Sequence, residues 1–276
     1  MKRSEKKERF NQIVKGIEEI KIQGAKNIAK KALYAYLLIP TERSKKKLLS
    51  LRPTEPLLRN VLGRADKNSH REIMRHFDDS QDEINKYVLK IIKNNDVIFT
   101  HCHSSTVSNA LIYAKKYKKK FEVYNTETRP LFQGRKTTLE LKRAKIRVTQ
   151  FVDSAAMVAL TKRQSTKRAD KVFLGADALT KDGVINKIGS GMFSKIAKDN
   201  KIPVYILTDS WKYSPRKIEL EQRAGSEIWE RASKKLSKKL NLRIKNPAFE
   251  FVPKKYIKAI VSELGVFSYD KFLKKV

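Results

Sequence analysis

The stretch NDVIFTHCHSSTV, residues 95–107, decides the fold. Its apolar part, Val97–Phe99, is rich in β-branched and aromatic residues, which predicts a buried strand. Polar residues follow at once, and a helix is expected over Val107–Lys116. The N-cap candidates of this helix are Ser104, Ser105 and Thr106. Open α/β sheets build ligand sites from such a strand, turn and helix N-terminus, where unpaired N–H groups favour a phosphate. The only cysteine of the chain, Cys102, lies at this turn.

Strands and helices alternate from Asp96 onward. The strand candidates are Val97–Phe99, Phe121–Tyr124, Val148–Val152, Lys171–Leu174 and Val204–Leu207. Helices are expected over Val107–Lys116, Thr137–Ala144, Ser154–Leu160 and Lys187–Lys198. This alternation predicts parallel strands with right-handed crossovers, hence an α/β fold with a Rossmann-like doubly wound sheet over residues 94–276. After Ser210 the composition shifts, and a polar helix is expected beyond Pro215.

Residues 1–93 have a different pattern and are predicted to form a helical N-terminal domain. Apolar residues recur every three or four positions in two stretches. They are Phe10, Ile13, Ile17 and Ile20, then Ile28, Ala32, Leu33, Tyr36 and Leu37. Gln23–Asn27 marks the break between the two. Pro53 and Pro56 interrupt the helices again, and a long helix from about His70 to Lys93 completes this part.

Composition excludes several classes of protein. The 276 residues are 40% hydrophobic and 33% charged, which is typical of a soluble globular protein with a sizeable core. No apolar run approaches the roughly 18 residues of a membrane span. The N-terminus lacks an apolar signal core, and a single cysteine excludes an internal disulfide framework. We therefore expect a cytoplasmic protein with no membrane partner.

The net charge of +33 (pI ≈ 10.1) is extreme. Nucleic-acid binding, focusing of an anionic substrate and lysine-rich composition bias all compete to explain it. The lysines form scattered clusters, and no aromatic-interleaved RNA-binding motif accompanies them. These clusters are Lys45–Lys47, Lys115–Lys120, Lys234-Lys235, Lys238-Lys239 and Lys274-Lys275. Composition bias ranks first, with better capture of an anionic substrate as a by-product. Weak non-specific RNA binding, which high salt would abolish, stays open.

Polar residues follow each predicted strand and should converge at one edge of the sheet. Cys102 follows the first strand and is either a buried small hydrophobe or a reactive thiol. Its position beside two histidines and a helix N-terminus favours the reactive thiol, with a pKa lowered below the free value of about 8.5. His101 and His103 have strand-type spacing that could hold a metal. No third ligand is placed by spacing, so we expect no metal site.

The other strand-end residues each have a structural alternative. Asp177 follows Gly175-Ala176 and either caps the next turn or faces a ligand. Arg129 and Arg135 flank Gln133-Gly134 and are either solvated charges or a clamp on phosphate. Asn186-Lys187 is expected to open a helix, where Asn186 as a plain N-cap is an equally good explanation.

Four motifs, in this order, together resemble one superfamily. They are Thr100-His101-Cys102-His103-Ser104, Glu127-Thr128-Arg129-Pro130 with Gln133-Gly134, Gly175-Ala176-Asp177, and Asn186-Lys187-Ile188-Gly189. The superfamily contains the regulatory subunits of translation initiation factor 2B, methylthioribose-1-phosphate isomerase and ribose-1,5-bisphosphate isomerase. The resemblance extends over nearly the whole chain, from Gln23-Gly24-Ala25 to Ser262-Glu263-Leu264-Gly265. One departure is Gln23, which stands where the isomerases usually have an arginine.

Among the branches, Cys102 and Asp177 match the pair that distinguishes the isomerases. Arg52-Pro53-Thr54 matches an isomerase substrate-binding segment. Asp209–Pro215 and Asn246–Phe249 are closer to the ribose-bisphosphate and initiation-factor branches than to the methylthioribose branch. The resemblance therefore implies an aldose–ketose isomerase that forms ribulose 1,5-bisphosphate. The alternatives are a non-enzymatic regulatory protein of the initiation factor 2B type and methylthioribose-1-phosphate isomerase.

The resemblance also implies roles for individual residues. Cys102 would take the C2 proton as a thiolate, and Asp177, with a raised pKa, would serve the ring oxygen as an acid. Substrate would be bound by Gly24, Ala25, Arg52, Ser104, Ser105, Arg129, Gln133, Arg135, Asn186, Lys187 and Lys212. Such enzymes use no cofactor and act in nucleotide salvage, so AMP is an expected activator. A homo-oligomer, dimer or hexamer, is expected.

Overall fold

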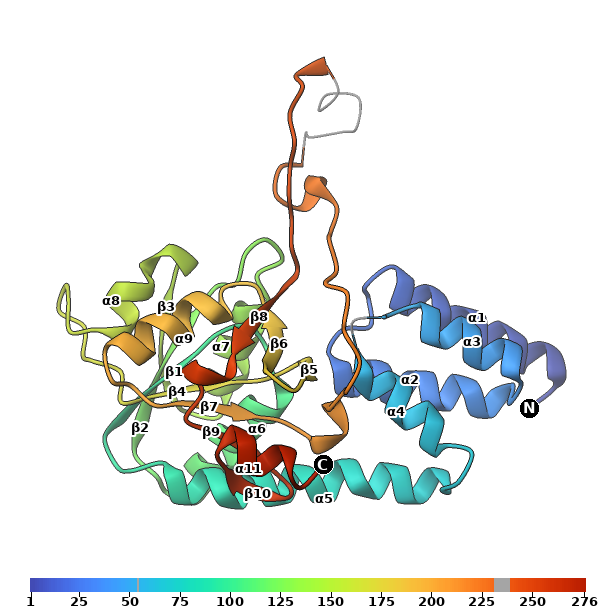
Figure 1. Ribbon diagram of the computed structural model, residues 1–276, viewed down its shortest axis with the longest axis horizontal. Helices are drawn as coiled ribbons and strands as arrows, with labels where there is room; N and C mark the ends of the chain where they lie inside the picture. Colours follow the sequence, from blue (N-terminus) through green and yellow to red (C-terminus); the bar gives the residue numbers. More distant parts are fainter. Residues whose placement is uncertain (54, 231–238) are drawn as a thin grey trace.

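The computed structural model describes residues 1–53, 55–230 and 239–276 (Figure 1). Four residues singled out from the sequence lie outside the described residues. They are Thr54 of the segment Arg52-Pro53-Thr54, and Lys234, Lys235 and Lys238 of the lysine clusters. Within the described residues, no helix is long and apolar enough to cross a membrane.

Helices alone make up the first part of the chain, as predicted (Figure 1). Their bounds are α1 Arg3–Glu18, α2 Ala25–Leu38, α3 Glu42–Ser50, α4 Pro56–Arg64 and α5 His70–Ile91. The periodic apolar residues of α1, among them Phe10, Ile13 and Ile17, pack with residues of α2, α3 and α4 in one buried cluster. Ser69 and Glu72 form a capping box that begins α5.

Within the described residues, seven strands form the main sheet in the order β10-β9-β7-β4-β1-β2-β3. The strands are β1 Asp96–Thr100, β2 Phe121–Thr126, β3 Arg147–Phe151, β4 Lys171–Leu174, β7 Val204–Leu207, β9 Ala259–Ser262 and β10 Gly265–Phe267. Neighbours pair in parallel except β9 and β10, which are antiparallel. The five predicted strands are all present, and the doubly wound α/β fold is confirmed.

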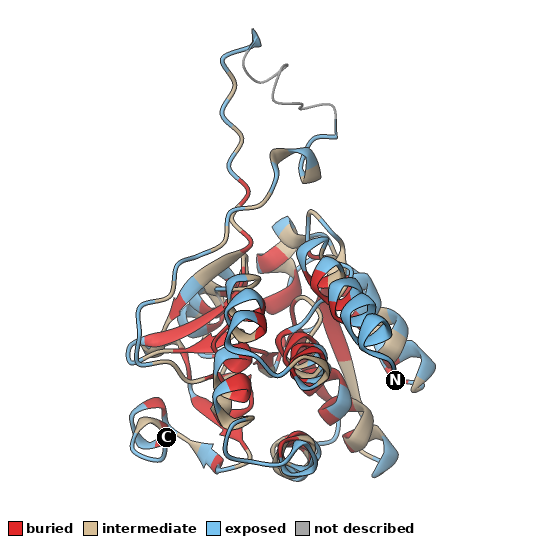
Figure 2. Cartoon of the chain, turned by 90° about the vertical axis from the view of Figure 1, so that its right-hand side faces the viewer, coloured by how far each residue is buried: buried red, intermediate tan, exposed pale blue. Residues whose placement is uncertain are grey.

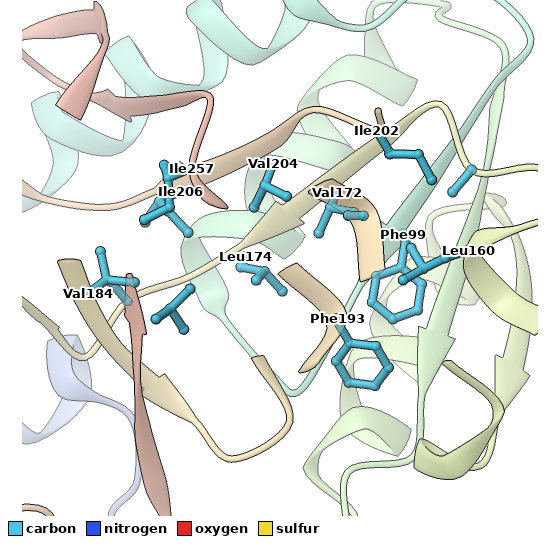
Figure 3. Close-up of a cluster of buried hydrophobic side chains, with 14 of the residues drawn as sticks. Phe99, Leu160, Val172, Leu174, Val184, Phe193, Ile202, Val204, Ile206 and Ile257 are labelled. Carbon is cyan, nitrogen blue, oxygen red and sulfur yellow. The ribbon is translucent and has the colours of Figure 1, made fainter. Parts of the chain in front are cut away.

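Both faces of this sheet are covered by helices. On one face α5, α6 (Ser105–Lys116) and α7 (Gln133–Arg143) pack over Ile98 and Phe173. On the other face α8 (Ala156–Leu160), α9 (Ser190–Asp199) and α11 (Tyr269–Leu273) pack over Phe99 and Leu174 (Figure 3). Successive residues of β1 and β4 thus enter opposite clusters, which explains why these strands are continuously apolar in sequence.

The winding of the chain reverses between β1 and β4. The chain runs from β1 to β2 and β3 on one side, then returns to β4, β7 and β9 on the other. Because the connections on either side leave in opposite directions, the carboxyl ends of β1 and β4 border a crevice. Cys102 follows β1 and Asp177 follows β4, so the topology brings the two predicted catalytic residues to the same crevice.

Two local predictions are wrong. The helix predicted from Lys187 begins at Ser190, and Asn186 and Lys187 end strand β6, Gly183–Lys187. This strand lies in a small antiparallel sheet with β5 (Ala178–Leu179) and β8 (Phe249–Pro253). Lys187 pairs with Phe249, and a partner so far along the chain leaves no local signal at β6.

The polar helix predicted beyond Pro215 is also not found in residues 216–230. There the chain is extended apart from a 3₁₀ turn, Gly225–Glu227, and leaves the body as part of an arm (Figure 1). Figure 2 shows that the described part of this arm is mostly exposed. The remainder of that prediction falls on residues 231–238, outside the described residues.

Candidate active site

A cavity of about 290 Å³ opens at the carboxyl edge of the sheet, where the winding reverses. Its walls come from both parts of the chain. The helical part contributes Ile20, Gln23, Gly24, Ala25, Lys26, Asn27, Arg52 and Glu55. The strand ends and the segments after them contribute His101–Thr106, Gln133, Lys136, Gly175–Asp177, Asn186, Lys187, Lys212, Arg223, Ala248 and Phe249.

Most of the residues predicted from the sequence line this cavity. They are Cys102, Asp177, Gly24, Ala25, Arg52, Ser104, Ser105, Gln133, Asn186, Lys187 and Lys212. Arg129 and Arg135 are not among the lining residues. Both are exposed and lie over the ring of Phe132, and Arg135 also pairs with Glu127 at 3.3 Å. This arrangement matches the solvated-charge alternative and gives no support to a phosphate clamp.

Cys102 occupies a turn with unusual backbone geometry. Its φ of 67° is left-handed, which is uncommon for a residue with a side chain. The turn is held because the Cys102 amide donates to Thr128 Oγ1 (3.0 Å) and its carbonyl accepts from Thr137 Oγ1 (2.9 Å). Thr128 is held in turn by Asp153, whose carboxylate accepts from the Thr128 amide at 2.8 Å. The position of the thiol is therefore determined by residues of three separate segments.

The predicted pKa of Cys102 needs correction. Burial raises the pKa of the thiol to about 11, whereas the sequence predicted a lowered value. The charge of Lys187 and a hydrogen bond with the His103 backbone oppose this shift, but desolvation of the thiolate is the larger effect. The thiol is consequently protonated at neutral pH in the ligand-free protein.

The two histidines beside Cys102 are engaged with protein groups. His101 is buried, with Nδ1 at 2.5 Å from Thr126 Oγ1 and Nε2 at 2.8 Å from the Ile188 carbonyl. Burial lowers the pKa of His101 to about 4, so its ring is neutral and structural. His103 Nε2 lies 3.0 Å from Glu140, and burial also lowers the pKa of His103.

The potential metal ligands of the described residues gather elsewhere. Among the described residues, one group of three potential ligands lies together. It consists of His76, Asp209 and Glu263, whose ligand atoms are within 4.8 Å of one another. None of the three lines the cavity. His76 Nε2 is already 3.1 Å from Asp209, and Glu263 accepts from the backbone and side chain of Ser210.

Asp177 lines the same cavity as Cys102 and lies two residues beyond Gly175. A Cβ at Gly175 would approach Ser104 Oγ to 2.7 Å, so a glycine allows the end of β4 to approach the N-terminus of α6. The Asp177 amide donates to the Ile185 carbonyl at 2.9 Å. Among the described residues its carboxylate makes no hydrogen bond or ion pair, so the capping alternative is not found. Burial raises the pKa of Asp177, and Lys212, Lys187 and Arg52 oppose the shift.

Lys187 and Lys212 are buried lysines of the cavity wall, exposed to only 8% and 7%. Lys212 Nζ donates to the Ala176 carbonyl at 2.5 Å, which holds it beside Asp177. No hydrogen bond or ion pair of the Lys187 ammonium was found among the described residues, and its charge acts on both Cys102 and Asp177. Asn186 donates to Ser190 Oγ at 2.8 Å and so connects β6 to the start of α9.

Arg52 belongs to a network of charged residues at the cavity wall whose other members were not predicted from the sequence. Arg52 pairs with Glu55 (3.2 Å) and with Glu221 (3.3 Å), and Glu221 pairs with Arg223 (3.5 Å). Glu55 is 3% exposed, and burial raises its pKa to about 7. The local signal at Glu55 is that of a residue before Pro56 at a helix start, which indicates a cap and not a site.

Two helix N-termini also face the cavity. Gly24, with φ 83°, precedes α2, whose first backbone bond runs from the Ile28 amide to the Gly24 carbonyl at 2.9 Å. The amides of the first turn therefore have no partner within the helix. Ser104 caps α6 by accepting from the Val107 amide at 3.4 Å. Unpaired amides and helix dipoles at two points of one cavity suit an anionic ligand.

The fold and the site define a Rossmann-type α/β protein with a cavity at the switch point of its sheet, and the lining of this cavity suits an anionic small molecule. Residues 64–269 match the Initiation factor 2 subunit family, and the chain belongs to this family. Ribose 1,5-bisphosphate isomerase of Thermococcus kodakarensis is 32% identical to it, over 92% of this chain and 89% of that protein. The protein of the same name from Methanocaldococcus jannaschii is 33% identical, over 91% and 88%.

Solved structures agree with this assignment. Translation initiation factor eIF-2B of Pyrococcus horikoshii superimposes with a TM-score of 0.79 and 26% identity, over 95% of this chain and 97% of that chain. The 5-methylthioribose 1-phosphate isomerase of the same organism superimposes with a TM-score of 0.75, over 96% and 86%. Because its identity is 20%, this second likeness concerns the fold alone.

The raised pKa of Cys102 predicts slow alkylation. At pH 7.5 the folded protein should react with iodoacetamide roughly 100-fold more slowly than the guanidinium-unfolded chain, in which the pKa is near 8.5. Lys187→Met should slow the folded protein further, because the lysine charge favours the thiolate. Mass spectrometry over pH 6–10 measures both rates on the single cysteine. Equal rates in the folded and unfolded states would contradict the burial of the thiol.

Proposed function

We propose that this protein is an isomerase that converts ribose 1,5-bisphosphate into ribulose 1,5-bisphosphate. The observation that carries the proposal is the placement of Cys102 and Asp177 after the neighbouring strands β1 and β4, on one cavity. A thiol and a protonatable carboxyl group can supply the base and the acid that an aldose–ketose isomerisation requires. The archaeal relatives named ribose 1,5-bisphosphate isomerase support the choice of substrate.

The proposed reaction moves one proton from C2 to C1 and opens the ring. The Cys102 thiolate takes the C2 proton, and the electron pair of that bond forms a C1–C2 double bond. The bond between C1 and the ring oxygen breaks, and the ring oxygen takes a proton from Asp177. Asp177 then takes the C2 hydroxyl proton of the resulting enol, and the Cys102 thiol returns a proton to C1, which leaves the C2 ketone and restores both groups. Atoms and charge balance without an oxidant or reductant.

Lys187 suits the stabilisation of charge during these steps. The charge of its buried ammonium lowers the pKa values of both Cys102 and Asp177. Among the described residues this ammonium makes no hydrogen bond or ion pair. It therefore favours the thiolate before proton abstraction and would donate to the oxygen on C2 as negative charge develops there. One such donor is typically worth about 10²–10³ in rate.

The phosphates of the substrate are proposed to bind at the periphery of the cavity. The α2 terminus offers Gly24 and Ala25, and the α6 terminus offers Ser104 and Ser105. Arg52, Gln133, Asn186 and Lys212 complete the proposed binding residues. Arg52 is held by Glu55 and Glu221 in the ligand-free protein, so a phosphate would compete with these carboxylates for its guanidinium group.

Two further properties are proposed with the reaction. We propose that AMP activates turnover and that the chain forms a homo-oligomer; one structural relative is a tetrameric eIF2B-beta2-delta2 complex. Turnover with and without AMP tests the first, and light scattering tests the second. Weak RNA binding is a separate proposal that rests on the charge of +33 alone, and a filter-binding assay at low and high salt tests it.

Cys102→Ser should lower kcat for ribose 1,5-bisphosphate roughly 10²- to 10⁴-fold, because the serine hydroxyl is a far weaker acid. Substrate binding, measured by calorimetry, should change little. Formation of ribulose 1,5-bisphosphate is the readout, and methylthioribose 1-phosphate is the control substrate. Wild-type protein that turns over only the control would establish methylthioribose-1-phosphate isomerase instead. Turnover of neither would favour the regulatory alternative.

Asp177→Asn should change the pH dependence of kcat as well as its size. Burial raises the pKa of Cys102 to about 11 and also raises that of Asp177. The active state needs the thiolate and a protonated Asp177, so over pH 7–9 wild-type kcat should rise less steeply with pH than kcat of the variant. In the variant only the thiolate matters, and kcat should rise about tenfold per pH unit. A flat profile in the variant would contradict these roles.

A further inference from the structure

Three lysines that line the cavity have no carboxylate within ion-pair distance in the described part of the chain. They are Lys26, Lys187 and Lys212. The charges of Lys187 and Lys212 lower the pKa of Asp177, so these two lysines lie at the proposed reaction centre. The charged groups with the largest effect on the pKa of Lys26 are Lys30, Asp209, Asp78 and Lys212. Lys26 is a third cavity cation and comes from helix α2.

Lys26 is the second residue of α2 and stands among the unpaired amides of its first turn. Its ammonium donates to the Phe77 carbonyl at 2.6 Å and lies 5.5 Å from the centre of the Phe77 ring. An ammonium group has three N–H donors, so this bond holds the lysine in place while other donors remain. The neighbouring Gln23 carries no charge, and its amide donates to the Ile20 carbonyl at 2.8 Å.

We propose that Lys26 is the cation that binds a substrate phosphate at the N-terminus of α2. Of the residues that α2 and the segment before it contribute to the cavity, from Ile20 to Asn27, Lys26 alone is charged. Its ammonium adds a full positive charge to the first-turn amides and the helix dipole, which attract the same anion. The choice of a sugar bisphosphate as the ligand rests on the proposed function; the affinity for phosphate rests on the geometry.

This lysine should also limit the pH range of phosphate binding. Burial lowers the pKa of Lys26 to about 8, and Lys30 and Lys212 lower it further, while Asp209 and Asp78 oppose the shift. Above this pH the free protein loses the charge, so phosphate binding weakens as pH rises from 8 to 10. An arginine keeps its charge over this range.

The test uses two ligands and the full chain. Lys26→Met should weaken binding of inorganic phosphate, measured by calorimetry at pH 7, roughly 10- to 100-fold. It should raise KM for ribose 1,5-bisphosphate by a similar factor with a smaller change in kcat. Lys26→Arg should keep phosphate binding at pH 7 and abolish the loss between pH 8 and 10. Restoration of binding by Gln23→Arg in the Lys26→Met protein would show that the charge itself is needed.

Lys30→Met is the matched control. Lys30 lies on the same helix, 5.3 Å from the centre of the same Phe77 ring, and pairs with Asp78, but it does not line the cavity. This variant should bind phosphate like the wild type. Equal phosphate affinity in Lys26→Met and wild type would overturn the inference. So would an unchanged pH profile in Lys26→Arg, even if Lys26→Met fails to fold.

The two proposals fail differently. Wild-type protein that binds phosphate through Lys26 without turning over ribose 1,5-bisphosphate would remove the isomerase function and keep the phosphate site. Turnover by the wild type, with KM and phosphate affinity unaffected in Lys26→Met, would keep the isomerase and remove the role of Lys26.

Discussion

Because the chain winds outward from β1 in both directions, the carboxyl ends of β1 and β4 must border an open crevice. The rest of the site depends on this constraint. It places Cys102 and Asp177 on one cavity, which is also lined by the N-terminus of α6, the helix that follows β1. Gly175 lets the end of β4 approach Ser104 closely. The helical part completes the cavity with the N-terminus of α2 and with Arg52, which neither strand could supply.

Within the cavity, burial has a larger effect on the titratable groups than their charged neighbours. It raises the pKa values of Cys102, Asp177 and Glu55, and lowers those of His101 and Lys26. Each of these groups is thereby displaced toward its neutral form. An anionic ligand would bring charge that the cavity lysines can pair with. Perturbed pKa values gathered at one cavity are typical of functional sites.

The family context shows why residues, and not the fold, must carry the functional argument. Proteins named as isomerases and proteins named as initiation factors share this architecture. A regulatory surface needs neither a thiol nor a carboxyl group facing a common cavity. The combination of Cys102, Asp177 and Lys187, whose ammonium has no partner among the described residues, therefore favours the catalytic interpretation over the regulatory one. The cavity also contains Lys26, close to Gln23, which carries no charge.

The sequence by itself determined the helical first part, α5, the strands β1, β2, β3, β4 and β7, and the order of the polar strand ends. These features depend on local apolar periodicity, which the chain displays without its tertiary partners. Only the tertiary structure decided the small sheet of β5, β6 and β8, because Lys187 pairs with a residue as distant as Phe249. It also brought Glu55 and Arg223 to the cavity wall, and it reversed the expected pKa shift of Cys102. The desolvation of a thiol depends on all the segments that pack around it. It therefore cannot be predicted from one stretch of sequence.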